Sequence, residues 1–408
     1  MNPEAMLSRL RLILGNAASA LLTPAFWVCG WMVYAMVRLA APVRRIRLGL
    51  LIHGRIGHLT INTETYLRAR ELGSEPSDDL PVIFSGRPAN EHLLRMIRRR
   101  LTIIRFPLAG VFFRRGVLPR IAGGPHEIRL DRGFDPNQYR EFNDIPAQLS
   151  FTPDEERRGR RLLKSMGIED GAPFVCFHAR DPVYLDSVHA YASRREWSTH
   201  DYRDCEIENY LPAARTLVEK GLTAVRMGHL VAKRLDTPSP GIVAYAERHR
   251  TDFGDIYLSA RCKFFLGNTA GIFCVAQIFD VPIAAANFTP LGTVPLSRRD
   301  IFTPKLYRRA SSGDPIPFRE LVDSGADRWY QGSRYAEAGI VPIENTAEEI
   351  LELALEMNDR LDGAWKPAPE DEELQERYRA LFPKGHRIHG FPCRVGAAFL
   401  RRHRTLLG

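Results

Sequence analysis

Four polar segments stand directly after apolar runs in this sequence of 408 residues, and they contain residue types that bind anions. They are residues 53–58, 178–181, 226–229 and 267–271. If each apolar run is a strand of an open parallel sheet, these segments are loops at its carboxyl edge, where such sheets bind ligands. Arginine side chains and exposed backbone amides both bind phosphate. The pattern therefore predicts a cleft for an anionic ligand.

Residues 267–271 read Gly-Asn-Thr-Ala-Gly and form the most specific of these segments. Gly267 and Gly271 would let the backbone approach a ligand closely, and a helix predicted to begin at Ala270 would offer free amides to a phosphate. Asn268 and Thr269 can cap that helix. Capping alone is the structural alternative, but the polar character of the neighbouring loops favours ligand binding.

Arg180 and Arg226 each come just past an apolar run, where a charge should avoid the core. Two arginines at adjacent strand ends could neutralise a diphosphate leaving group. Asp181 and Gly228 belong to the same two loops and join the predicted anion site. In the structural alternative each arginine pairs with a carboxylate of the fold, which for Arg180 would be Asp181.

Histidines and carboxylates supply candidates for proton transfer. His53 and His58 flank the first loop, and His58 is the first candidate for a base that takes a proton from an acceptor hydroxyl. A histidine in a glycine loop can equally be a structural hydrogen-bonding residue. Asp201 is the next candidate for catalysis and Arg203 a further anion-binding residue, since both precede a helix predicted from Tyr210.

Missing motifs narrow the chemistry. The sequence has no G-x-G-x-x-G fingerprint, no G-x-x-x-x-G-K-[ST] loop and no D-x-D triplet, which disfavours an oxidoreductase or an ATPase. Its six cysteines form no C-x-x-C pair, so neither a zinc site nor a redox motif is indicated. The remaining possibility is a group transfer without metal or cofactor, in which arginine neutralises the charge of the leaving group. The net charge of +9 comes without a nucleic-acid-binding motif, so nucleic acid is not an expected partner.

Alternating strand and helix patterns must hold these loops in place. Strands are predicted at 48–52, 81–84, 102–104, 173–177, 222–226, 241–245, 262–266 and 281–285, and helices at 59–72, 153–166, 210–220, 252–260, 270–279 and 346–361. This order predicts an α/β fold of two Rossmann-like domains with parallel sheets, residues 47–160 and 161–362. Residues 363–408 are predicted to be a linker and a tail that docks back on the fold.

A hydrophobic segment precedes these domains and is assigned to residues 1–46. Residues 17–37 carry no charge and reach the length of about 20 residues that spans a bilayer, and arginines flank them on both sides. The pattern predicts a membrane-associated helix, which either spans the bilayer or lies in the interface with its tryptophans at headgroup depth. A hydrophobic helix packed on the protein itself is the alternative.

The motifs resemble a family of bacterial glycosyltransferases associated with surface-polysaccharide genes. The similar parts are residues 177–181 (Phe-His-Ala-Arg-Asp), 200–203 (His-Asp-Tyr-Arg), 225–228 (Val-Arg-Met-Gly) and 255–271, with weaker likeness at 54–62 and in the tail. In that family an Asn often follows the His-Asp-Tyr-Arg residues and completes an HDYRN-like motif. This chain has Asp204 at that position. The spacing of Leu258, Ala260, Phe265, Gly267 and Thr269 is also similar to the donor domain of two-Rossmann-domain transferases of the GT-B architecture.

The resemblance implies a division of labour between the two domains. The C-terminal domain would hold a nucleotide-sugar donor, and the N-terminal domain would hold a glycan or lipid-linked acceptor near His53, Arg55, Gly57 and Asn62. We therefore expect a hexosyltransferase-like, metal-independent enzyme of surface-polysaccharide synthesis at the cytoplasmic face of the inner membrane. The rival interpretations are a sugar-nucleotide epimerase on the same fold and a catalytically silent partner that binds nucleotide or glycan in an assembly complex.

Overall fold

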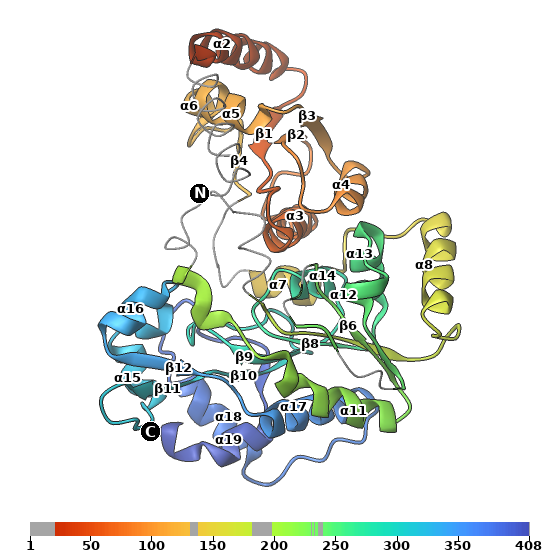
Figure 1. Ribbon diagram of the computed structural model, residues 1–408. Helices are drawn as coiled ribbons and strands as arrows, with labels where there is room; N and C mark the ends of the chain where they lie inside the picture. Colours follow the sequence, from red (N-terminus) through yellow and green to blue (C-terminus); the bar gives the residue numbers. More distant parts are fainter. Residues whose placement is uncertain are drawn as a thin grey trace, which may run out of the picture. The chain divides into compact units, whose positions relative to one another are not determined.

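The computed structural model describes residues 21–130, 138–181, 198–229, 231, 233–235 and 240–407 (Figure 1). The chain divides into two compact units. Unit 1 comprises Met1–Gly133 with Ala147–Ser150, and unit 2 comprises Phe134–Pro146 with Phe151–Gly408. Each unit is built on its own parallel sheet, so the predicted α/β architecture with parallel sheets is confirmed.

Unit 1 has a parallel sheet of four strands in the order β3-β2-β1-β4. Its strands are β1 (Ile46–Leu50), β2 (Leu80–Ser85), β3 (Thr102–Arg105) and β4 (Glu127–Ile128). Its helices are α2 (Thr23–Ala40), α3 (Ile56–Glu71), α4 (Glu91–Arg98), α5 (Ala109–Phe112) and α6 (Leu118–Ile121), with a π-helical turn at Phe113–Val117. The first strand begins two residues earlier than predicted. The two-residue strand β4 was not predicted because it is too short to show an apolar alternation.

The helix α2 packs on the π-helical turn through a close backbone contact. Gly30 and Val37 are its buried residues, and a Cβ at Gly30 would lie 1.9 Å from the carbonyl oxygen of Gly116. Phe26 and Val33 pack on the apolar cluster beneath. No helix among the described residues is long and apolar enough to cross a membrane.

Replacing Gly30 by alanine should lower the free energy of unfolding of unit 1 by about 1–3 kcal/mol, because the new methyl group would overlap backbone that cannot move cheaply. Gly54→Ala is the control, since a Cβ at Gly54 would meet nothing within 4 Å. Thermal melting of both variants measures the difference. Equal melting temperatures would show that α2 is not held at this contact.

Unit 2 has a parallel sheet of seven strands in the order β13-β10-β9-β8-β5-β6-β7, and a separate antiparallel pair, β11 and β12. The strands are β5 (Phe174–His178), β6 (Thr223–Arg226), β7 (Ile242–Val243), β8 (Phe265–Gly267), β9 (Ile283–Phe288), β10 (Ile301–Pro304), β11 (Leu306–Arg309), β12 (Ile340–Ile343) and β13 (Arg394–Val395). The helices are α7 (Gln138–Asp144), α8 (Pro153–Ser165), α11 (Leu211–Glu219), α12 (Tyr245–Arg248), α13 (Asp252–Arg261), α14 (Phe273–Ile278), α15 (Phe318–Asp323), α16 (Gly332–Glu337), α17 (Ala347–Leu361), α18 (Asp371–Ala380) and α19 (Ala397–Arg402). Single helical turns lie at Ser198–Arg203, Ile207–Tyr210, Ala326–Arg328 and Arg404–Leu407.

Both faces of the large sheet are covered, as a buried parallel sheet requires. Val175 and Phe177 of β5 point into a cluster with residues of α11 and α17, which lie side by side (Figure 1). Phe174 and Cys176 point the other way, into a cluster with residues of α8 and α13. Because its side chains are buried on both faces, β5 is an interior strand of the sheet. Its carboxyl end lies at the edge where ligands bind.

Local sequence signals explain where two long helices begin. Thr152 caps α8 and Thr346 caps α17, and in each case a glutamate three residues later completes a capping box. The C-terminal residues pack into the core of unit 2, where Tyr378, Phe382 and Phe399 are at most 2% exposed. This cluster explains the apolar character of residues 374–407.

Candidate functional site

The carboxyl edge of the sheet in unit 2 brings three of the predicted loops together. The strand β5 lies between β8 and β6. The backbone N–H of Arg180, after β5, donates to Asn268 Oδ1, after β8, at 3.0 Å. The imidazole Nδ1 of His178 lies 3.0 Å from the carbonyl oxygen of Met227, after β6. The sheet order therefore places the segments predicted to bind one anion beside one another.

Asn268 organises this edge rather than capping a helix. It is 1% exposed, and its Nδ2 donates to the carbonyl oxygen of Arg203 at 2.8 Å and to the Cys205 thiol at 3.2 Å. The helix predicted from Ala270 begins only at Phe273. The expectation that residues 267–271 pass straight into a helix was therefore wrong, because the chain makes a turn first.

The glycines of the β8 and β6 loops have packing roles. A Cβ at Gly267 would lie 2.9 Å from the Phe265 ring and 3.1 Å from the carbonyl oxygen of His178. A Cβ at Gly228 would lie 3.0 Å from Val231. Close packing within the sheet edge thus accounts for both residues without a ligand, whereas Gly271 is exposed.

A cluster of cations lies on this edge. The side chain of Arg180 pairs with Asp204, whereas the structural alternative had named Asp181. Lys305 is 3% exposed, and its Nζ donates to the carbonyl oxygen of Asp204 at 2.9 Å. Burial and then the charge of Arg203 lower the pKa of Arg180 to about 10, while the exposed Asp201 raises it. Like charges thus converge at this edge.

Lys305 and Asp204 are the site residues that sequence reasoning missed. Lys305 follows β10, which was not predicted as a strand, so no rule placed it at the carboxyl edge. Asp204 was given no role because it departs from the family pattern. The signal that could have found it is the spacing of residues 201–204, since one helical turn brings a carboxylate beside the β5 loop.

Three buried polar atoms of this edge lack hydrogen-bond partners among the described residues. They are the Tyr202 hydroxyl, Arg203 Nε and the Thr269 hydroxyl. The Tyr202 ring lies within 5.7 Å of the Arg203 guanidinium, and the Arg203 carbonyl oxygen is bound by Asn268, the neighbour of Thr269. A buried polar group without a partner costs free energy. These atoms are consequently suited to bind a polar ligand.

Arg226 has a partner within the fold. Its side chain is 4% exposed and donates to Glu247 Oε1 at 3.0 Å, and the same oxygen accepts from the N–H of Leu235. Burial lowers the pKa of Arg226, which the Glu247 charge partly restores. Arg226 is therefore held by a carboxylate, as the structural alternative predicted, and its role toward a ligand stays a prediction.

The stability of unit 2 should depend on pH through His178. Burial lowers the pKa of His178, which is partly exposed, to about 4. The hydrogen bond to the Met227 backbone opposes this shift. Between pH 4 and the ordinary value near 6.5 the unfolded chain binds more protons, so the free energy of unfolding should rise with pH by about 1–3 kcal/mol. His178→Asn should flatten this slope in melting curves, whereas His249→Asn should retain it. An unchanged slope in the His178 variant would contradict this assignment.

The predicted acceptor residues all lie around the start of α3 in unit 1. His58 is exposed in the first turn of the helix, and Asn62 lies one turn later on the same face. Arg55 precedes the helix as its N-cap residue and Gly57 lies in its first turn. The structure therefore brings Arg55, Gly57, His58 and Asn62 to one helix end.

His53 differs from the other acceptor candidates because it is packed against its neighbours. Its Nδ1 lies 3.0 Å from the carbonyl oxygen of Leu51 and 3.3 Å from the N–H of Gly86. A Cβ at Gly86 would lie 2.4 Å from the imidazole. These contacts favour the structural interpretation of His53.

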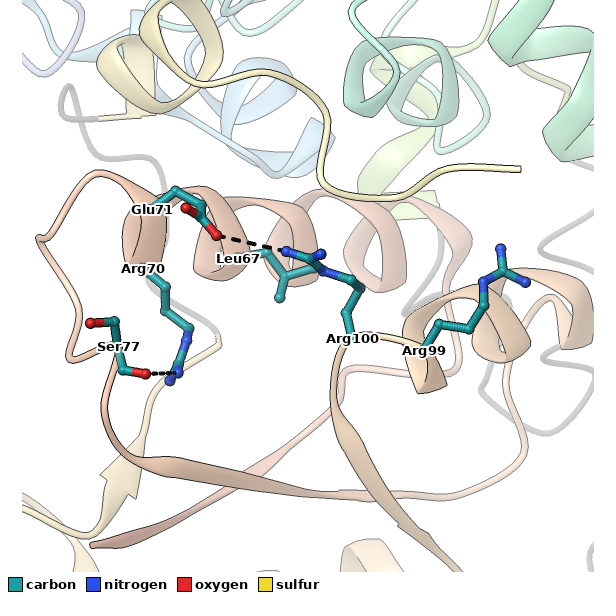
Figure 2. A pocket seen from close by; sticks show the side chains of 6 residues that line it. All are labelled: Leu67, Arg70, Glu71, Ser77, Arg99 and Arg100. Carbon is teal, nitrogen blue, oxygen red and sulfur yellow. Dashed lines mark hydrogen bonds and ion pairs between the residues drawn. The ribbon is translucent and has the colours of Figure 1, made fainter. Parts of the chain in front are cut away.

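A separate pocket of about 290 Å³ lies at the other end of α3 (Figure 2). It is lined by Leu67, Arg70, Glu71, Ser77, Arg99 and Arg100. All three arginines have partners: Arg70 pairs with Asp79, Arg100 approaches Glu71, and Arg99 donates to the carbonyl oxygen of Ser150. Twelve residues of helix, about 18 Å, separate Arg70 from His58, so this pocket is not part of the predicted acceptor site.

Several solved structures are similar to this chain. A glycosyl transferase family 9 protein from Veillonella parvula DSM 2008 has a TM-score of 0.46 and 11% identity over 77% of this chain and 97% of its own. The ADP-heptose lps heptosyltransferase II of E. coli has a TM-score of 0.40 and 16% identity over 64% and 91%. The iron-containing dodecameric glycosyltransferase TibC from enterotoxigenic E. coli H10407 has a TM-score of 0.32 and 11% identity over 62% and 61%.

Comparisons by sequence give no family. No family model matches the chain, and no curated protein matches it. At the identities and TM-scores above, the structural matches concern the arrangement of strands and helices.

Proposed function

We propose that this protein is a glycosyltransferase that moves a sugar from a nucleotide-sugar donor to a glycan or lipid-linked acceptor in surface-polysaccharide synthesis. Unit 2 binds the donor at the carboxyl edge of its seven-stranded sheet. Unit 1 presents the acceptor near the start of α3. This assignment has the division of labour of the GT-B architecture.

The observation that carries the proposal is the cluster of cations and unpartnered polar atoms on the edge of unit 2. Arg180, Arg203 and Lys305 converge there, and Asp201 and Asp204 offset only part of their charge. Arg203 Nε and the Thr269 hydroxyl are buried without partners among the described residues. A diphosphate would supply acceptors for these donors and charge for these cations.

The same arrangement suits catalysis of glycosyl transfer. As the bond between the sugar and the diphosphate breaks, the leaving group gains negative charge. Cations fixed in place before the reaction stabilise that charge more in the transition state than in the ground state. The proposed reaction therefore uses arginine in place of a metal ion, and needs a base such as His58 or Asp201 to accept the proton of the acceptor hydroxyl.

Release of nucleoside diphosphate from a panel of nucleotide sugars, with and without lipid-linked or glycan acceptors, tests the proposal. We expect release that depends on an acceptor, together with a glycosylated product of the matching mass. Isomerised donor formed without acceptor would indicate an epimerase. Donor binding without turnover across the panel would indicate a silent binding partner.

The proposed enzyme works at the cytoplasmic face of the inner membrane, where a nucleotide sugar and a lipid-linked acceptor can meet. The uncharged segment at residues 17–37 and the arginines around it support this location.

A further inference from the structure

The segment from Leu21 to Val43, which contains α2, holds most of the exposed large apolar side chains of the described chain. Of the twelve large apolar residues that are exposed there, nine lie between Leu21 and Val43. They are Leu21, Leu22, Trp27, Val28, Trp31, Met32, Met36, Leu39 and Val43, with exposed fractions from 39% to 93%. Such a concentration on one element marks an interaction surface.

The helix α2 is apolar on two opposite faces. At 100° per residue, Val28, Met32, Met36 and Leu39 fall within one stripe, while Gly30 and Val37 lie about half a turn away and are buried. The close contact between Gly30 and the Gly116 carbonyl oxygen fixes the inner face on unit 1. The outer stripe is therefore held outward by a rigid contact.

Two tryptophans at the border of this stripe are held in place. The Arg120 guanidinium lies 4.7 Å from the Trp27 ring centre and 4.9 Å from that of Trp31. The two rings contact each other edge to face, with centres 6.0 Å apart. Tryptophan rings at the edge of an apolar stripe are typical of the interface between headgroups and acyl chains.

The charges around α2 are of one sign. No aspartate or glutamate occurs from residue 5 to residue 63, whereas arginine occurs seven times in that stretch. Arg38 lies beside the last residue of the stripe, and Arg44 and Arg45 follow it. All three are exposed, as are Arg114 and Arg115 on the turn beneath the helix. This surface is complementary to anionic headgroups.

We propose that α2 docks unit 1 on the surface of an anionic lipid bilayer, with its axis parallel to that surface. Val28, Met32, Met36 and Leu39 enter the acyl-chain boundary, Trp27 and Trp31 lie at headgroup depth, and the arginines bind lipid phosphates. A spanning orientation would require α2 to leave its contact with Gly116. The helix α2 thus lies in the interface and does not span the bilayer, and its outer surface is independent of the proposed transfer reaction.

Sedimentation of the full chain with vesicles tests the inference. We expect binding to vesicles of phosphatidylcholine with one third phosphatidylglycerol, and at least about tenfold weaker binding after Val28→Glu, because a valine side chain no longer enters the bilayer. Val341→Glu is the matched control, since Val341 is an exposed valine of unit 2 (42%, against 55% for Val28). It should bind like the unaltered chain.

The charge component is tested by replacing Arg44 and Arg45 with glutamine. Binding to the anionic vesicles should fall by about fivefold for each arginine, while binding to pure phosphatidylcholine should change little. Release of nucleoside diphosphate with a soluble acceptor is measured alongside and should be the same in all these variants. Failure of transfer with intact vesicle binding would therefore affect the proposed function alone.

Three outcomes would overturn the inference. The first is equal vesicle binding by the unaltered chain and Val28→Glu. The second is a dimer of the unaltered chain that Val28→Glu converts to a monomer without any vesicle binding, which would make a second copy the occupant. The third is vesicle binding seen only after removal of residues 1–20, which would make that segment the cover of the stripe.

Discussion

Replacing His58 by alanine should lower turnover by roughly 10²–10⁴-fold, the range that a general base contributes. The residue is exposed in the first turn of α3, with Asn62 one turn further on the same face. Donor affinity should stay near the original value because the predicted donor residues belong to unit 2. Turnover is measured by release of nucleoside diphosphate, and affinity by calorimetric titration.

His53→Gln is the comparison for His58→Ala. His53 contacts Leu51 and packs on Gly86, so this variant should change the melting temperature more than the chemistry. A His58→Ala protein that keeps full activity would remove His58 from the mechanism. Asp201→Asn would then be the next variant, since Asp201 lies near Arg180 in unit 2.

Replacing Arg203 by alanine should weaken binding of the donor's nucleoside diphosphate by about 1.5–3 kcal/mol, the value of a hydrogen bond to a charged group. Turnover should fall further, by roughly 10²–10³-fold, if the cation acts mainly on the transition state. The melting temperature should change little, because Arg203 Nε has no partner to lose among the described residues. Lower stability with unchanged affinity would show a purely structural residue.

Arg226 provides the contrasting case because its side chain is already paired with Glu247. Arg226→Ala should lower the melting temperature, since it leaves the partly buried carboxylate without its cation. Arg226→Lys keeps the charge but loses the planar fork. If Arg226 also binds the diphosphate, the lysine variant should lose more turnover than nucleotide affinity. Unchanged turnover and affinity in a destabilised Arg226→Ala protein would show that Arg226 only stabilises the fold.

The sheet edge of unit 2 could be predicted from sequence because its central strands are long apolar runs followed by polar loops. Cys176, Val225 and Leu266 stand in such runs, and the structure places their strands side by side. The positions of these central strands were thus predicted correctly.

Features that depend on distant parts of the chain were missed. Lys305 reaches Asp204 across 101 residues of sequence, and no local pattern indicates that contact. Asn268 was predicted to cap a helix, but its side chain binds loops that only the tertiary fold brings near. The two-residue strand β13 is defined by its pairing with β10 and not by an apolar pattern of its own. Its position required the structure.

We propose that the carboxyl edge of unit 2 binds a nucleotide sugar through its cations. Melting curves of the full chain with a panel of nucleotide sugars test this binding. A ligand that binds the native state, at a concentration 100 times its dissociation constant, stabilises the protein by about 2.7 kcal/mol. We predict that at least one nucleotide sugar raises the melting temperature of the unaltered chain and of Val341→Glu, and that the rise is clearly smaller in Arg203→Ala. An equal rise in Arg203→Ala, or no rise with any nucleotide sugar, would contradict the claim.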